Sequence, residues 1–146
     1  MTSFGKRGEG PEEMVSADCF RFISKDSIWT LDANKMRTTR WKIEQNMNNI
    51  IPVETIDMDK RLVRALDFYP MESGFLVSDY LGEYRQKWTD REGKWIHSAN
   101  QIPTENNYED IARPALAQAW RSFFDYNPQK GILVMATQLG EALEIY

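Results

Sequence analysis

Short apolar and β-branched runs, separated by turn residues, recur along most of the chain. Such runs, bounded by Gly, Pro, Asn or Asp, are typical of β-strands. They predict strands at 19–23, 27–31, 75–81, 84–89, 95–98 and 132–136, with a last short strand at 142–146 after the turn at Gly140. The run at 132–136 is apolar without alternation, which is the pattern of a strand covered on both faces.

Three other segments have helical spacing. From Met36 the apolar residues fall at 36, 43, 47 and 50, and Pro52 ends the stripe. Thr38 and Thr39 are β-branched and weaken this helix, so a strand over 36–43 is the alternative.

A second helix is expected over 58–69, capped by Asp57 or Asp59, with Leu62 and Leu66 facing inward and Pro70 after it. The longest helix carries Ile111, Ala115, Ala119, Trp120 and Phe123. Pro114 belongs in a first helical turn, so this helix begins near Arg113, or a short turn over 108–112 precedes a kink. Together, the expected strands and helices predict an α+β fold, in which about three helices pack on a mainly antiparallel sheet.

The domain organisation follows from length and composition. The 146 residues suit a single domain. Residues 1–13 are rich in glycine and charge and predict a flexible tail, which leaves 14–146 as the α+β domain.

The segment Tyr84–His97 predicts a hairpin, because Gly93 suits a left-handed position that closes a three-residue loop. That register places Trp88 opposite Ile96 and Thr89 opposite Trp95. Alternation then gives one core face and one basic, aromatic face. The second face collects Arg85, Lys87, Thr89, Trp95 and His97.

The basic face of this hairpin is the first candidate binding surface. A tryptophan ring beside Arg85, Lys87 and the only histidine, His97, suits an anionic group or the acidic surface of a partner. The alternative is that a helix covers Trp95 and that the cations fan out into water.

A second candidate surface lies within 35–48. In a helix, Trp41 would point away from the apolar stripe, next to Arg37 and flanked by Glu44. Exposed tryptophan and arginine commonly anchor protein interfaces. The alternative is that Trp41 packs beneath the amino-terminal segment.

Composition narrows the compartment and the partners. The net charge of −4 is spread over interspersed residues, which argues against nonspecific binding to nucleic acid or membranes. Cys19 is the single cysteine, and no stretch suits a secretory signal or a transmembrane helix, so we expect a cytoplasmic protein.

No catalytic or cofactor motif stands out. One histidine cannot form a two-histidine metal site, and phosphate-binding glycine motifs are absent, so we expect no metal and no cofactor. A pair among Asp67, Glu72, Asp79 and Glu83 could do acid–base work in a cleft, which leaves an enzyme open as an alternative.

The leading hypothesis is a non-enzymatic protein that binds another protein, such as an immunity or inhibitor protein that occludes a partner's functional surface. One alternative is a protein or enzyme that takes a small anionic ligand in a cleft around Trp95 and His97. Another is an accessory subunit of a larger assembly, in which a free edge at 143–146 pairs with a neighbour, and homo-oligomers are possible.

Overall fold

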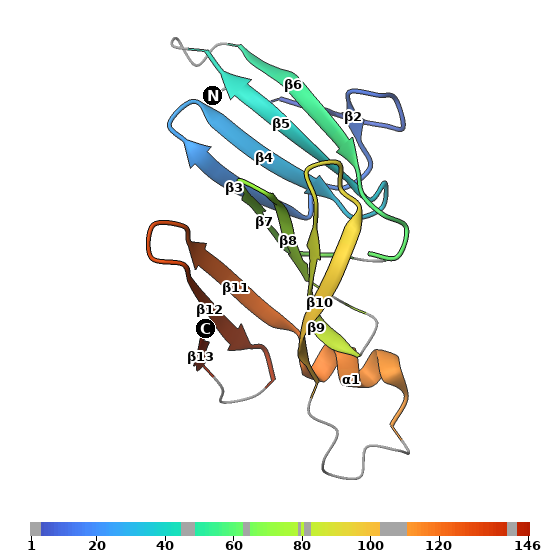
Figure 1. The fold of residues 1–146 in the computed structure, drawn as a ribbon. Helices are drawn as coiled ribbons and strands as arrows, with labels where there is room; N and C mark the ends of the chain where they lie inside the picture. Colours follow the sequence, from blue (N-terminus) through green and yellow to red (C-terminus); the bar gives the residue numbers. More distant parts are fainter. Residues whose placement is uncertain are drawn as a thin grey trace.

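Antiparallel strands make up nearly all of the regular structure (Figure 1). The computed structural model describes residues 4–44, 49–62, 65–78, 80, 83–102, 111–139 and 143–146. The strands form three meanders, which we call the first, second and third sheets, and one parallel pair of two-residue strands, β1 (Lys6–Arg7) and β2 (Glu13–Met14).

The first sheet has the order β3-β4-β5-β6, with bounds Cys19–Ser24, Ser27–Asp32, Arg37–Ile43 and Ile50–Asp57. One face of it carries Trp29, Leu31 and Ile56, which belong to or pack against the core shared with the second sheet. The opposite face, here called its outer face, carries Phe20, Phe22 and Trp41, because side chains alternate along each strand.

The second sheet has the order β10-β9-β8-β7, with bounds Trp95–Gln101, Tyr84–Thr89, Gly74–Ser78 and Phe68–Met71. Apolar side chains lie on both of its faces. Phe68, Phe75 and Val77 face the first sheet, whereas Leu76 and Trp88 face the third sheet. β8 is therefore buried along its whole length, which explains its unbroken apolar run.

The third sheet has the order β11-β12-β13, with bounds Ser122–Asn127, Ile132–Thr137 and Leu143–Ile145. A seven-residue helix, α1 (Arg113–Ala119), precedes it and has Pro114 in its first turn. Phe124, Leu133 and Met135 pack against the second sheet. Phe123, Ala136 and Leu143 lie on the opposite, outer face of the third sheet.

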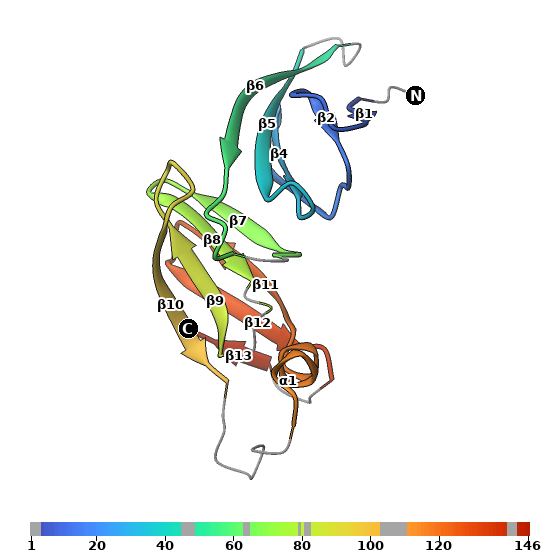
Figure 2. The same cartoon turned by 90° about the vertical axis from the view of Figure 1, so that its right-hand side faces the viewer.

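Two cores hold the three sheets face to face in chain order (Figure 2). Trp29 of the first sheet meets Phe75 of the second edge-on, with ring centroids 5.1 Å apart. Tyr69 of the second meets Tyr126 of the third in the same way at 5.6 Å. Each fully buried Leu or Phe in these cores stabilises the fold by roughly 1.5–3 kcal/mol.

The α+β prediction is wrong: the fold is mainly β, with one short helix among the described residues. The stripe over 36–50 does not form a helix, because Arg37–Ile43 is strand β5, the alternative that Thr38 and Thr39 had suggested. In the segment expected as the second helix, the described residues are not helical: Leu62 and Ala65 are buried in the first core, and β7 begins at Phe68.

The third predicted helix is also wrong in its length, because the observed helix is shorter. α1 ends at Ala119, and Phe123 lies in strand β11. The alternative turn over 108–112 falls mostly outside the described residues. Strands were predicted correctly at 19–23, 27–31, 84–89 and 132–136, where β3, β4, β9 and β12 lie.

Residues 4–15 lie on the outer face of the first sheet (Figure 2). Phe4 packs edge-on against Trp41 with ring centroids 5.2 Å apart. Lys35 Nζ donates to the carbonyl oxygens of Gly10 and Glu13 at 2.9 and 2.5 Å. The flexible tail over 1–13 and the single domain over 14–146 stay predictions.

Candidate functional site

The predicted hairpin forms, but a bulge divides its basic face. Gly93 closes the three-residue loop at φ 78°, and an added Cβ there would lie 2.8 Å from the carbonyl oxygen of Asp57. Thr89 lies opposite Trp95, as predicted. A register shift at Ile96 then sets His97 opposite Trp88, so the predicted pairing of Trp88 with Ile96 is wrong.

The bulge separates His97 from Trp95. His97 is exposed and stacks on Trp88, with ring centroids 5.6 Å apart and an interplanar angle of 16°. Trp95 turns toward the first core, where the Arg61 guanidinium lies 4.6 Å from its ring centroid. The Trp95 backbone N–H donates to Asp59 at 3.3 Å. The segment around Asp59 and Arg61, not a helix, covers the ring.

Arg85 and Lys87 lie on β9, an interior strand of the second sheet, and both are buried. Arg85 forms an ion pair with Glu144 of β13, donates to Tyr146 Oη at 3.1 Å, and lies 5.6 Å from the Trp120 ring centroid. Lys87 Nζ donates to the carbonyl oxygen of Arg61 at 2.9 Å. Each of the two cations therefore connects β9 to another segment of the chain, and they do not form the exposed basic face that the sequence predicted.

Burial lowers the pKa of Arg85, but the hydrogen bonds and charge of Glu144 outweigh it, so the net pKa is raised. The same hydrogen bond from Arg85 holds the pKa of Glu144 below its ordinary value. Both groups therefore stay charged across neutral pH and tie the third sheet to β9.

The second predicted surface does not form either. Trp41 is only 3% exposed, and its Nε1 donates to Thr30 Oγ1 at 2.8 Å. It packs beneath the amino-terminal segment. Arg37 pairs with Asp57 at 2.6 Å, and Glu44 is exposed and accepts from Asn49 at 3.3 Å. The seven predicted site residues thus fall into two groups, one on or next to β5 of the first sheet and one on β9 and β10 of the second.

The residues that do converge come from the first strand of each sheet. Arg21 of β3 donates from Nε to the Phe68 carbonyl oxygen of β7 and from Nη2 to the Phe124 carbonyl oxygen of β11, each at 3.1 Å. It also forms an ion pair with Asp67 at 2.6 Å. This group, which we call the three-strand junction, links all three sheets.

Asp67 is the acceptor at the centre of the three-strand junction. Its carboxylate accepts from Arg21, from Cys19 Sγ at 3.0 Å and from the Phe68 N–H at 2.9 Å. Burial, with the nearby negative charge of Asp67, raises the pKa of the Cys19 thiol to about 12. Cys19 therefore stays protonated as a hydrogen-bond donor and is a poor nucleophile.

A hollow of about 320 Å³ opens beside the three-strand junction. Arg21, Arg85 and Arg121 line it together with Asp18 and Asp67. Arg21 and Arg85 are each paired with a carboxylate, and Arg121 lies 5.2 Å from the Phe123 ring centroid. Two of the three guanidinium groups are therefore neutralised within the protein, which makes this hollow a structural junction more than an anion site.

The opposite ends of the same first strands border a larger cleft of about 450 Å³, here called the hairpin-end cleft. Trp29 and Phe75 contribute from the two sheet interiors, and Ile23, Tyr69 and Met71 contribute from strand ends. Its charged lining residues are Arg40, Glu54, Glu72 and Arg91. Neither cysteine nor histidine lines it.

The hairpin-end cleft combines an apolar interior with paired charges. Arg40 Nε lies 3.2 Å from Glu54 Oε2, and Arg91 donates to the carbonyl oxygen of Glu72. Apolar walls with charged neighbours are the composition of a surface that takes an apolar side chain from a protein partner.

Sequence reasoning missed both regions. Arg21 was assigned to a strand and given no role, and Asp67 was noted only among scattered acids. Their 46-residue separation carries no local signal. A charged residue inside the apolar run 19–23 was the one available hint.

Within the described ranges, no group of three or more His, Cys, Asp and Glu side chains could hold a metal ion. In the same ranges, no helix has the length and apolar character needed to cross a membrane.

Comparison with known proteins shows the family of the chain. The family described as TolB-like 6-blade propeller-like matches residues 1–146. No curated protein matches the chain. The three antiparallel meanders packed in chain order agree with this family, because propellers are built from successive antiparallel sheets around an axis.

Proposed function

We propose that this chain, which belongs to the TolB-like six-bladed propeller-like family, is a non-enzymatic protein that binds another protein at the hairpin-end cleft. The cleft itself carries the proposal. Its volume of about 450 Å³ accommodates one or two large apolar side chains of a partner, and charged residues border it. An immunity or inhibitor role, in which the bound partner's functional surface is occluded, belongs to this class.

The occupant that fits is an extended segment with an apolar side chain flanked by polar residues. Trp29 and Phe75 are nearly fully buried and form a rigid floor, so the cleft needs little rearrangement to accept that side chain. Arg91 and Glu72 are exposed and offer both signs of charge to the flanking residues.

A small-ligand site around Trp95 and His97 is not supported, because the bulge at Ile96 sends these two side chains to different surroundings. A cytoplasmic location is part of our proposal. The single cysteine supports it, since the chain cannot form an internal disulfide.

Selection of random twelve-residue peptides displayed on phage against the immobilised protein tests the proposal. We expect enriched peptides to share an aromatic or aliphatic anchor. Their binding should fall at least tenfold in an Ile23→Asp, Met71→Asp double variant, because both side chains line the cleft.

Val53→Asp is the matched control, since Val53 is 44% exposed, as is Ile23, and does not line the cleft. It should bind the selected peptides normally. Peptides without an apolar anchor, or equal binding to the double variant and the wild-type protein, would contradict the proposal.

A further inference from the structure

The two arginines that line the hairpin-end cleft differ in how their charge is balanced. Arg40, on the first sheet, pairs with Glu54 across 3.2 Å. Arg91, on the loop between β9 and β10, is exposed and forms no ion pair with any described carboxylate. The positive charge at the second-sheet side of the cleft is therefore available to a partner.

One nitrogen of the Arg91 guanidinium is held by the second sheet. Its Nε donates to the carbonyl oxygen of Glu72, in the turn between β7 and β8. A backbone carbonyl carries no net charge, so this bond orients the side chain without neutralising it. The two terminal nitrogens make no hydrogen bond to a described residue. A guanidinium in this state can bind a carboxylate through two parallel hydrogen bonds.

The loop that carries Arg91 is fixed by hydrogen bonding and close packing. The Gly93 N–H donates to the Asp90 carbonyl oxygen at 3.1 Å and closes the loop. Gly74 lies against the start of the loop, where an added Cβ would be 2.0 Å from the Thr89 carbonyl oxygen. Because backbone packs directly on backbone here, a partner meets Arg91 already in position and loses little free energy in ordering it.

The acidic residues near Arg91 are less suited to select a partner. The Asp90 carboxylate accepts from the Lys94 N–H at 2.8 Å and is engaged within the loop. Glu72 and Glu92 are exposed, and neither carboxylate pairs with a described cation. A free carboxylate side chain loses conformational entropy when a partner fixes it, whereas Arg91 is already held. This side of the cleft thus favours an acidic residue in the partner over a basic one.

We infer that the hairpin-end cleft selects partner segments in which an acidic residue lies close to the apolar anchor, and that Arg91 makes this selection. The inference rests on the proposed function, because it specifies the partner of the same cleft. Phe75 of the cleft floor pairs directly with Thr89, and Arg91 follows Thr89 by two residues. The guanidinium is therefore about one to three residues of an extended segment away from the anchor.

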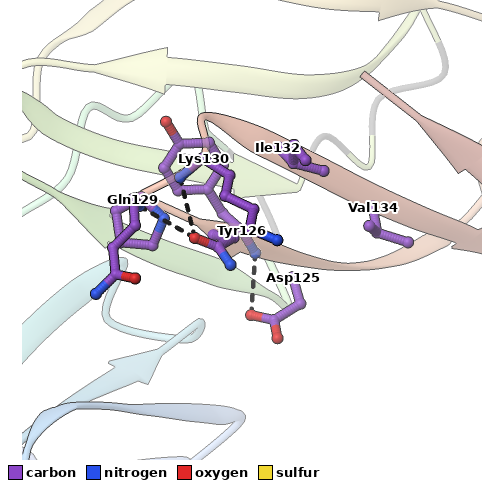
Figure 3. Close-up of a pocket in the computed structure, with 8 residues that line it drawn as sticks. Asp125, Tyr126, Gln129, Lys130, Ile132 and Val134 are labelled. Atoms are coloured by element: carbon purple, nitrogen blue, oxygen red, sulfur yellow. Dashed lines mark hydrogen bonds between the residues drawn. The ribbon is translucent and has the colours of Figure 1, made fainter.

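A second hollow, of about 540 Å³, adjoins the cleft and supplies a matched control. Pro128 lines both hollows, whereas Lys130 lines only the second one. The N–H groups of Gln129 and Lys130 both donate to Asn127 Oδ1 at 3.1 Å, so this side chain is engaged within the turn (Figure 3). Lys130 is exposed, as is Arg91, and Lys130→Glu makes the same change of charge without altering the lining of the cleft.

Parallel phage selections from one library of random twelve-residue peptides test the inference. Against the wild-type protein, we expect Asp or Glu to be enriched within about three residues of the apolar anchor. Against Arg91→Glu, Lys or Arg should be enriched at that position instead. Selection against Lys130→Glu should give the wild-type pattern. Circular dichroism of both variants checks that they are folded.

Titration of a selected peptide measures the contribution of Arg91 directly. The fluorescein-labelled peptide is compared with an analogue in which the acidic residue is replaced by its amide, and fluorescence polarisation reports binding. The analogue should bind the wild-type protein at least ~5-fold more weakly. Arg91→Gln, which keeps a polar side chain but no charge, should bind the two peptides equally. The difference on the wild-type protein should shrink at about 0.5 M NaCl, because the rim is exposed and salt screens its charge.

The outcomes separate this inference from the proposed function. Equal affinity of the two peptides for the wild-type protein, or the same acidic preference on Arg91→Glu, would overturn the inference. If the Ile23→Asp, Met71→Asp double variant still loses binding in that case, the proposed function stands alone. Enrichment of no peptide on the wild-type protein would overturn both.

Discussion

Replacing Asp67 by alanine should destabilise the protein far more than removing an ordinary surface carboxylate. Asp67 accepts hydrogen bonds from the Arg21 guanidinium, the Cys19 thiol and the Phe68 N–H. The side chains of Arg21 and Asp67 are 26% and 12% exposed, so solvent replaces these bonds poorly. The charged bond is worth about 1.5–3 kcal/mol and each neutral one about 0.5–1.5 kcal/mol. We therefore expect Asp67→Ala to lower the free energy of unfolding by about 3 kcal/mol.

Urea unfolding followed by tryptophan fluorescence measures this loss. The matched control is Glu54→Ala, which removes the Arg40–Glu54 pair, whose side chains are 40% and 43% exposed. An exposed pair of this kind contributes about 0–1 kcal/mol. A double-mutant cycle with Arg21→Ala should give a coupling energy of about 1–3 kcal/mol between Arg21 and Asp67. A loss for Asp67→Ala no larger than that for Glu54→Ala would refute the reasoning that the three-strand junction holds the sheets together.

Three further predictions follow from burial and charge. Trp41→Ala should lower the free energy of unfolding by about 3–5 kcal/mol because the ring is buried. His97→Ala should lower it by under about 1 kcal/mol because His97 is exposed, and urea unfolding of both variants measures the difference. The pKa of Glu144 is lowered by its pairing with Arg85, so this pairing stabilises the fold above the ordinary pKa of 4.5. The stabilisation is lost as the pH falls through the lowered pKa. The free energies of unfolding at pH 7 and pH 4 should therefore differ less in Glu144→Gln than in the wild-type protein. Burial raises the pKa of the Cys19 thiol to about 12, so little thiolate is present in the folded protein at pH 8. Iodoacetamide at this pH should therefore alkylate the folded protein at least ~100-fold more slowly than the urea-unfolded protein. Equal rates would show that the thiol is accessible and ionised in the folded protein.

The candidate site could be predicted only in fragments. The hairpin loop was readable because Gly93 at a left-handed position is a local requirement, and so was the pairing of Thr89 with Trp95. The bulge at Ile96 was not readable, because no residue there demands it, and one extra residue moved His97 to the other face. The three-strand junction was beyond reach, since Arg21, Asp67 and Phe124 meet only after three sheets have packed.

By itself, the sequence determined several strand positions, such as those of β3, β4, β9 and β12, because φ/ψ preferences and two-residue alternation act within a few neighbours. It missed β6, β7 and β11. It did not decide between helix and strand at 36–43, where the apolar spacing fits a helix and the threonines favour a strand. In the structure this segment pairs with β4 on one side and with β6 on the other, and it therefore forms strand β5. Tertiary structure alone decided which faces are buried. The apolar run of β8 is buried along its whole length between two sheets, whereas the similar apolar run of β12 has its alternate residues Ile132, Val134 and Ala136 less buried than Leu133 and Met135. Burial depends on which distant segments stack on a strand, and local sequence preferences do not specify that choice.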